Sequence, residues 1–386
     1  MKLIFCLDPL RVSLTGIGRY TYELAKGLRD SKQLESLKFQ FLLGWVYDPQ
    51  TLINKYHTDE QVQAKAGKPS WFKGSVYHAL RSGYRATFPT VKGLITLPYK
   101  DYIYHSPNYE IPHFAGKCVS TVHDLSVLRC PQYHPAIRVR YQEAMFPNLI
   151  QKGSLFITDS EFSKNELLDF YPAAKGRVVS VPLGANSMFC VRAPQTIAGT
   201  LARYGLSPGN YALSVGTIEP RKNIDRLIEA YAQLPLSLRK QYPLVLVGGA
   251  GWNSKHIHQL IAKYSQEGWL KYLRFVPDLD MAAIYSGARV FACVSHYEGF
   301  GLPVLEAMAS GVPVISSDVA SLPEVGGEAA LYVNPNQTDQ ITHALKTVLD
   351  DDRYCQILSE KGLERAKLFS WNRTVQETLQ AYGQIA

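Results

Sequence analysis

Short apolar runs alternate with helical patterns along the whole chain, and this alternation limits the possible fold more than any other feature. It is typical of parallel sheets whose faces are covered by helices. The chain has 386 residues, which is too long for one ordinary hydrophobic core, so we expect two domains. The twelve expected strands are 3–7, 39–44, 102–105, 118–122, 155–158, 178–181, 211–215, 244–247, 272–276, 290–294, 314–316 and 330–333.

The boundary between the two domains is expected near residues 182–208, which contain three prolines and are followed by a Gly-Asn turn. We therefore predict an N-terminal α/β domain over 1–190 and a C-terminal α/β domain over 205–370. Ligands of such doubly wound sheets bind at the carboxyl ends of the strands. The last segment, 371–386, follows a serine and has an amphipathic helical pattern.

The composition excludes several classes of protein. Apolar residues make up 46% and charged residues 19% of the chain, as in a globular protein. The first apolar stretch stops at Asp8, which is too short for a signal peptide, and no apolar run approaches a membrane span. The six cysteines are scattered and form no Cys-x-x-Cys pair. We expect reduced thiols in a cytosolic protein, and no zinc site.

The positive charge of the chain, +8 in total, lies in its first half. Residues 1–190 contain 23 Lys and Arg against 15 Asp and Glu, whereas the remainder contains 18 of each. Basic residues mixed with aromatic ones over 61–100 suit an anionic membrane surface. Nucleic acid and a plain solvated loop are the alternatives, and no nucleic-acid-binding motif supports the former. The basic residues of this stretch are Lys65, Lys68, Lys73, Arg81, Arg85, Lys92 and Lys100.

The segment from Glu298 to Ser316 is the strongest indication of a binding site. A helix is expected to begin at Pro303, because proline suits the first helical position. The unpaired amides of that helix start, after a Gly-Phe-Gly turn, form an anion site. Glu298 lies just outside this site and Glu306 about one turn inside the helix, so a bound phosphate would have a carboxylate on each side. The alternative interpretation of this segment is an ordinary helix start with two solvated glutamates.

Two cations follow another expected strand. Arg221 and Lys222 come after a strand and a turn that begins at Gly216, and they precede a helical pattern. This places them at the carboxyl end of the strand, where ligands bind. Such cations, together with helix amides, can neutralise an anionic ligand without a metal ion. An exposed Arg-Lys pair on solvated surface is the alternative interpretation.

Two further segments of the N-terminal half have the same placement. Gly16 and Gly18 follow the first strand and open a helix from about Arg19, where Arg11 or Arg19 could add charge. Without a Cβ atom, such glycines let the backbone approach a phosphate closely. His123 ends an apolar strand and would face the ligand, although a packed core histidine is the usual alternative.

These four segments, taken together and in their order along the chain, resemble the signatures of retaining glycosyltransferases of family 4. The resemblance covers most of the chain. It implies the GT-B fold, in which two Rossmann-like doubly wound domains face a cleft and a final helix, here 371–386, crosses back to the N-terminal domain. Within the family, the chain is most similar to bacterial mannosyl- and rhamnosyltransferases of surface-polysaccharide assembly, such as O-antigen or exopolysaccharide.

The resemblance also implies residue roles. Arg221 and Lys222 would bind the diphosphate, Glu306 the ribose, and Glu298 the hydroxyls of the donor sugar, with His123 also contacting that sugar. The anomeric configuration would be retained through front-face attack on the donor sugar, with the leaving phosphate helping to deprotonate the acceptor hydroxyl. Backbone groups near the nucleotide are expected at Gly16, Gly18, Gly216, Val276, Phe300, Gly301 and Leu302.

We therefore expect a metal-independent retaining hexosyltransferase that uses a nucleotide sugar and no cofactor. The first expectation is mannose from GDP-mannose, moved to a glycan or a polyprenyl-diphosphate-linked acceptor in bacterial polysaccharide or lipopolysaccharide biosynthesis. A UDP-sugar donor stays open. A nucleotide-sugar 2-epimerase of the same fold and a basic nucleic-acid-binding protein are the rival functions. The expected location is cytoplasmic and peripheral, at the anionic inner leaflet of the membrane, without a nucleic-acid partner.

Overall fold

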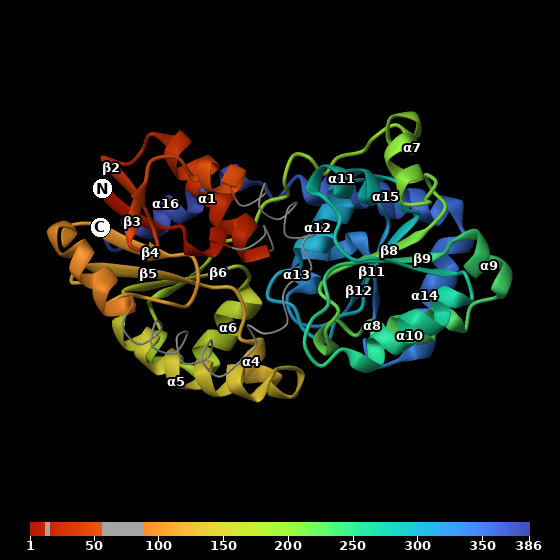
Figure 1. Cartoon of the computed structure of the whole chain (residues 1–386), viewed down its shortest axis with the longest axis horizontal. Helices are drawn as coiled ribbons and strands as arrows, with labels where there is room; N and C mark the ends of the chain where they lie inside the picture. The colour runs from red at the N-terminus through yellow and green to blue at the C-terminus, as the bar shows by residue number, and fades with distance from the viewer. Residues whose placement is uncertain (12–15, 56–87) are drawn as a thin grey trace.

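The computed structural model describes residues 1–11, 16–55 and 88–386. Its two α/β domains lie side by side, each built on a largely parallel sheet (Figure 1). The strands of these sheets are short and mostly buried on both faces, as in parallel sheets that lie between helices. The predicted fold class, two doubly wound parallel-sheet domains, is confirmed.

The N-terminal sheet has seven strands in the order β3-β2-β1-β4-β5-β6-β7. The prediction of a single strand over 39–44 is wrong. The chain turns at Leu42, whose φ is 53°, and returns as the antiparallel strand β3. The strands are β1 (Lys2–Cys6), β2 (Ser36–Phe41), β3 (Gly44–Val46), β4 (Ile103–Ser106), β5 (Lys117–Val122), β6 (Leu155–Thr158) and β7 (Val178–Ser180).

The C-terminal sheet has six parallel strands in the order β10-β9-β8-β11-β12-β13. The strand predicted over 272–276 lies two residues earlier, at Leu270–Leu273. These residues, β10, pair with the four residues of β9, and the strand ends at Leu273. The strands are β8 (Ala212–Val215), β9 (Leu244–Val247), β10 (Leu270–Leu273), β11 (Val290–Cys293), β12 (Val314–Ser317) and β13 (Ala330–Val333).

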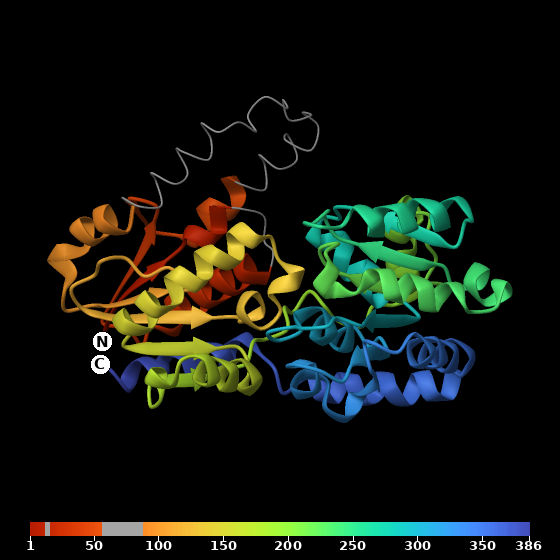
Figure 2. The same ribbon diagram turned by 90° about the horizontal axis from the view of Figure 1, so that it is seen from below.

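Helices pack on both faces of each sheet (Figure 2). In the N-terminal half they include α1 (Gly16–Ser31), α4 (Ser126–Arg129), α5 (Ala136–Lys152) and α6 (Glu161–Phe170), and residues 49–55 and 88–96 are also helical. Those that follow are α7 (Pro194–Arg203), α8 (Ile224–Ala232), α9 (Leu236–Gln241), α10 (Lys255–Gln266), α11 (Asp278–Ser286), α12 (Leu302–Ala309), α13 (Leu322–Gly326), α14 (Thr338–Asp350), α15 (Asp352–Ala366) and α16 (Trp371–Gly383).

The last helix, α16, belongs to the N-terminal domain, where it packs beside α1 (Figure 1). Its N-cap is Ser370, whose hydroxyl accepts a hydrogen bond from the backbone of Arg373 at 3.2 Å. Thr374 donates to the carbonyl of Pro182 at 2.7 Å. At its far end, the hydroxyl of Tyr382 lies 2.5 Å from Nδ1 of His105 on β4. The chain therefore crosses twice between the two domains.

Most of the basic stretch lies outside the described residues, including Lys65, Lys68, Lys73, Arg81 and Arg85. Lys92 is not a surface cation, because it is 4% exposed and its ammonium lies 2.6 Å from a carboxylate oxygen of Asp8. Among the residues that the structure describes, no helix combines the length and the apolar character that crossing a membrane requires.

The contact between Tyr382 and His105 gives a test of how α16 stabilises the N-terminal domain. Burial, followed by the charge of His123, lowers the pKa of His105 to about 3, so the ring is neutral. Tyr382→Phe would leave Nδ1 without a partner in the core, which costs about 1–3 kcal/mol. Urea denaturation should show this loss, whereas Tyr47→Phe, at a side chain 98% exposed, should not change the free energy of unfolding. Equal stability of the two variants would contradict the prediction.

Candidate active site

The predicted donor-site residues gather where the strand order of the C-terminal sheet reverses. The neighbouring strands β8 and β11 lead to β9 on one side and to β12 on the other. The carboxyl ends of the strands at such a switch point form the usual ligand site of open α/β sheets. The segment after β8 carries Gly216, Arg221 and Lys222, and the segment after β11 carries Glu298. Two loops that are distant in sequence therefore meet there.

Arg221, Lys222 and Glu298 form a buried ion cluster. The ammonium of Lys222 lies 2.6 Å from one carboxylate oxygen of Glu298, and Arg221 lies 3.1 Å from the other. Ser295 donates a further hydrogen bond to Glu298 at 2.7 Å. Arg221 also pairs with Glu219 at 2.8 Å. The structure thus brings together the two cations and the first carboxylate of the predicted site.

Electrostatics keep Glu298 ionised. Burial alone would raise the pKa of its carboxyl group, which is 7% exposed, but the charges of Lys222 and then Arg221 outweigh burial and lower the pKa to about 2. Burial likewise opposes the charge of Arg221, whose pKa is nevertheless raised by Glu298 and other carboxylates. The side chain of Lys222 lies over Gly216, where an added Cβ would be 3.5 Å from its Cε atom.

A helix start lies beside this cluster. Gly301 precedes α12 with a φ of 116°, a conformation that favours glycine, and a Cβ there would lie 2.9 Å from Leu322. The helix begins at Leu302, one residue before the predicted Pro303. Its first amides lack helical partners and carry partial positive charge, which suits a phosphate.

The ring of Phe300 is buried, which leaves only its main chain for the predicted site. Its ring is 6% exposed and packs edge-on against Phe369, with 5.9 Å between ring centroids. The hydroxyl of Ser321 lies 2.8 Å from the carbonyl oxygens of both Glu298 and Phe300 and shares its one proton between them, which fixes the turn. The ring therefore anchors the turn in the core, as expected for a residue that offers only main-chain groups.

Glu306, the second predicted carboxylate, is 8% exposed on α12. Burial raises the pKa of its carboxyl group to about 7, although Arg19 and Tyr285 partly offset this and Asp278 adds to it. Arg19 comes from α1 in the other domain and pairs with Asp278 at 3.2 Å. Val276, predicted near the nucleobase, is buried two residues before Asp278. The surroundings of Glu306 are thus shared between the two domains.

Gly16 and Gly18 lie in the first turn of α1, near Arg19. The helix begins at Gly16, where an added Cβ would have no atom within 4 Å, and Gly18 is buried. Residues 12–15, the loop that precedes them, lie outside the described residues. The contact of Arg19 with Asp278 shows that this end of α1 faces the C-terminal domain.

His123 follows β5, and both of its ring nitrogens have partners within the N-terminal domain. Nδ1 lies 2.7 Å from Asp159, and Nε2 lies 2.9 Å from the carbonyl oxygen of Pro107. Because a carbonyl only accepts, Nε2 carries a proton. Burial opposes a charged ring, but Asp159 outweighs it and the pKa of His123 is raised. The contact of this side chain with a donor sugar stays a prediction.

The main chain of His123 meets the C-terminal domain directly. A Cβ added to Gly299 would lie 2.1 Å from the carbonyl oxygen of His123, so a side chain at this position would push the domains apart. The carbonyl of Gly299 also accepts hydrogen bonds from Ser160 at 2.7 Å and from Ser163 at 3.1 Å. Gly299 follows Glu298, so the domains touch beside the ion cluster.

Two further contacts join the domains. The carboxylate of Glu324 accepts hydrogen bonds from the backbone amides of Glu161 and Phe162 at 2.8 and 2.5 Å, and so caps α6 from the other domain. Trp252 donates to the carbonyl of Tyr133 at 2.7 Å. The ring of Tyr133 in turn stacks on His296, with 5.1 Å between centroids.

Sequence reasoning missed several of these residues. Asp159 and Glu324 carry no motif, and their partners are far away in the sequence. For Tyr297, the available signal was its place directly before Glu298. The carbonyl of Tyr297 accepts a 2.6 Å hydrogen bond from Arg221.

The chain contains two Asp-x-Asp sequences, of which one lies near the site. Asp278 pairs with Arg19, and Asp280 pairs with Arg203 at 2.7 Å and with Tyr204 at 2.6 Å. The other begins at Asp350. Within residues 1–11, 16–55 and 88–386, no group of three or more His, Cys, Asp or Glu is placed to hold a metal ion.

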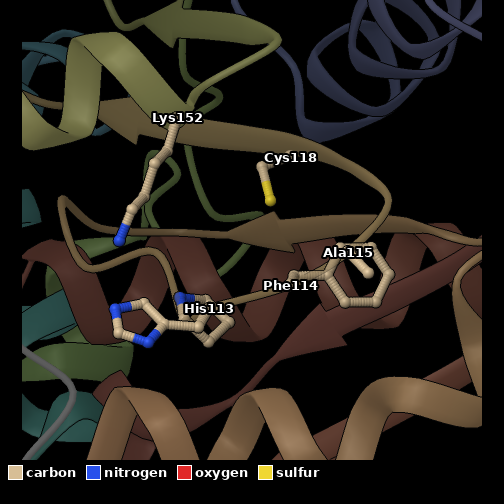
Figure 3. A pocket seen from close by; sticks show the side chains of 6 residues that line it. His113, Phe114, Ala115, Cys118 and Lys152 are labelled. Carbon is tan, nitrogen blue, oxygen red and sulfur yellow. The ribbon is translucent and has the colours of Figure 1, made fainter.

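A cavity of about 450 Å³ lies elsewhere, at the amino end of β5 (Figure 3). Its lining includes His113, Phe114, Cys118 and Lys152. His123 follows the opposite end of the same strand. The cavity is therefore separate from the predicted site, and none of the predicted site residues lines it.

Comparison with known proteins identifies the family of the chain. Residues 204–365 match the family model described as glycosyl transferases group 1. The chain is 39% identical to the O-antigen chain mannosyltransferase B of Escherichia coli, over 99% of both chains.

Solved structures are similar over the whole chain. HepE of Anabaena, solved in complex with UDP and glucose, has a TM-score of 0.71 and 19% identity over 99% of this chain and 100% of its own. Sucrose-phosphate synthase of Thermosynechococcus elongatus has a TM-score of 0.68 and 20% identity over 100% and 99%. At these identities the structures support the fold alone, whereas the E. coli relative establishes the family. The chain belongs to the group 1 glycosyl transferases.

Proposed function

We propose that the enzyme transfers mannose from a nucleotide sugar, GDP-mannose as the first candidate, to a growing O-antigen glycan. The observation that carries the proposal is the buried cluster of Arg221, Lys222 and Glu298 beside the amino end of α12. The full-length relative is a mannosyltransferase of the O-antigen chain. Transfer of mannose to an acceptor therefore fits these observations better than epimerisation of a free nucleotide sugar or binding of nucleic acid.

The proposed reaction needs no resident cofactor and no metal ion. Arg221, Lys222 and the first amides of α12 neutralise the charge that develops on the leaving diphosphate. Glu298 holds both cations in place and also accepts hydrogen bonds from the hydroxyls of the donor sugar. We propose retention of the anomeric configuration, with the leaving phosphate taking the proton of the acceptor hydroxyl on the same face of the sugar.

Substitution of either cation tests this assignment. Arg221→Ala and Lys222→Ala should each lower kcat by about 10²–10³-fold, the usual effect of losing one preorganised donor. Transfer from GDP-mannose to a mannosylated acceptor would be measured in EDTA, and wild-type activity should persist in the chelator. Lys367→Ala is a matched control, because this lysine is 68% exposed and pairs with Glu364 on the surface. Wild-type turnover in both cluster variants would refute the assignment.

Glu306 should make donor binding depend on pH. With a pKa of about 7 in the free protein, its carboxyl group is largely protonated at pH 6 and largely ionised at pH 8. We propose that the ribose hydroxyls donate to the ionised form, so affinity should rise through pH 7 and be about tenfold higher at pH 8 than at pH 6.

Calorimetric titration with GDP-mannose, without acceptor, measures this pH dependence. A sugar nucleotide is suitable because its diphosphate is esterified at both ends and does not titrate in this range. Glu306→Gln should bind with an affinity that hardly changes with pH. A flat profile for the wild-type enzyme would exclude ribose binding to an ionised Glu306.

For the acceptor, we propose a lipid-linked glycan at an anionic membrane surface in the cytoplasm. The support is the excess of basic residues in the N-terminal half of the sequence, with 23 Lys and Arg against 15 Asp and Glu over residues 1–190. Each engaged basic residue contributes about 1 kcal/mol near such a surface. Lys92, held by Asp8 in the interior, does not take part.

Vesicle co-sedimentation checks the membrane proposal. The protein should bind vesicles that contain phosphatidylglycerol and should not bind purely zwitterionic ones, and salt should weaken the binding. Neutralising Lys65, Lys68, Lys73, Arg81 and Arg85 together should abolish it. A matched set of five neutralised surface cations in the C-terminal half serves as the control. Undiminished binding by the first variant would contradict the proposal.

A further inference from the structure

The five residues 295–299 contact both the ion cluster and the N-terminal domain. Ser295 and Glu298 take part in the cluster. Gly299 lies against the carbonyl of His123. A displacement of this segment relative to the N-terminal domain would therefore move a donor-site carboxylate. Tyr297 lies within this segment, directly before Glu298.

The phenol of Tyr297 is held entirely by the N-terminal domain, although the residue belongs to the C-terminal one. Its side chain is 2% exposed. The hydroxyl accepts a hydrogen bond from the backbone amide of Leu125 at 3.1 Å and donates one to the carboxylate of Glu166. The ring packs edge-on against Phe162, with 5.6 Å between centroids. Each of these contacts exists only while the domains are together.

Glu166 is itself fixed in place. It is 4% exposed on α6, and its other carboxylate oxygen lies 2.6 Å from Nε of Arg129. The phenol thus donates to a paired and charged acceptor, which makes a stronger hydrogen bond than a neutral one. The N-terminal domain presents a preformed socket, which consists of the Leu125 amide, Glu166 and the ring of Phe162.

The main chain of Tyr297 faces the other way, toward the donor site. Its carbonyl accepts a 2.6 Å hydrogen bond from Arg221. The same nitrogen, Nη1 of Arg221, lies 3.1 Å from the carboxylate of Glu298, the next residue in the chain. The position of one residue therefore fixes both a cation and a carboxylate of the cluster.

We infer that Tyr297 is a positioning residue, which arranges Arg221 and Glu298 for transfer when its phenol enters the socket of the N-terminal domain. It links domain closure to the donor site without touching the donor. The inference rests on the proposed function for the identity of the donor. Closure that completes a site in this way affects turnover more than the binding of a ligand held mainly by one domain.

Tyr297→Phe removes only the hydroxyl group and tests this inference. With saturating GDP-mannose and acceptor, kcat should fall at least about tenfold, the effect of losing one hydrogen bond to a charged group. The dissociation constant for GDP, measured by calorimetry, should change less than about threefold. Glu166→Gln keeps an acceptor but removes its charge, so it should lower kcat by a smaller factor.

Tyr211→Phe is the matched control. Tyr211 is also a fully buried tyrosine of the C-terminal domain, but its hydroxyl donates to the carbonyl of Ile284 at 2.6 Å within the same domain. This variant should keep wild-type kcat. The inference is wrong if Tyr297→Phe turns over at the wild-type rate, or if its kcat and its affinity for GDP fall by the same factor.

Small-angle X-ray scattering of the free protein separates this inference from the donor proposal. Tyr297→Phe should have a larger radius of gyration than the wild-type protein. Loss of the hydroxyl destabilises the closed arrangement, in which the phenol occupies the socket, and does not affect the open one. Tyr211→Phe should match the wild type. If the wild-type enzyme transfers no mannose, the donor proposal fails while scattering still decides on Tyr297. An unchanged radius in Tyr297→Phe then overturns the inference.

Discussion

The buried ion pairing of Glu298 with Lys222 and Arg221 is the interaction on which the rest of the site depends. A carboxylate taken out of water is tolerated only when it is paired and hydrogen-bonded. Removal of one partner from such a group leaves an uncompensated charge, at a cost of about 3–5 kcal/mol. The segments after β8 and β11 are therefore held against each other by ion pairs within the protein.

The same segment sets the relation between the domains. At Gly299 the backbone of one domain meets the backbone of the other, at a distance that excludes any side chain. Around this point the domains exchange directional hydrogen bonds, through Ser160, Glu324 and Tyr297. Such bonds depend on close alignment and are lost after a small rotation. A small rotation between the domains would therefore break several of these hydrogen bonds together.

Local pattern was enough to predict most of the fold. Each buried strand is a short apolar run between turn residues, and both glutamates of the site stand in one segment with the helix start between them. The hairpin of β2 and β3 was missed, because a positive φ at Leu42 has no signal in the sequence. Glu324 and the amides it caps are more than 160 residues apart. Lys92 belongs to the basic stretch predicted for the surface, and nothing near it in the sequence indicates its buried partner Asp8. Contacts of this kind follow from the tertiary fold and are absent from local periodicity.

The return of α16 to the N-terminal domain has a consequence for synthesis of the protein. The apolar face of α1 and the polar core around His105 are completed by residues at the very end of the chain. About 190 residues separate β7 from α16, so a ribosome working at about 5–20 residues per second delivers that helix roughly 10–40 s later. The C-terminal domain, whose sheet is contiguous in sequence, can fold during this interval. The first domain to be translated is then the last to be completed, and a truncated chain would expose its unfinished core to aggregation and proteolysis.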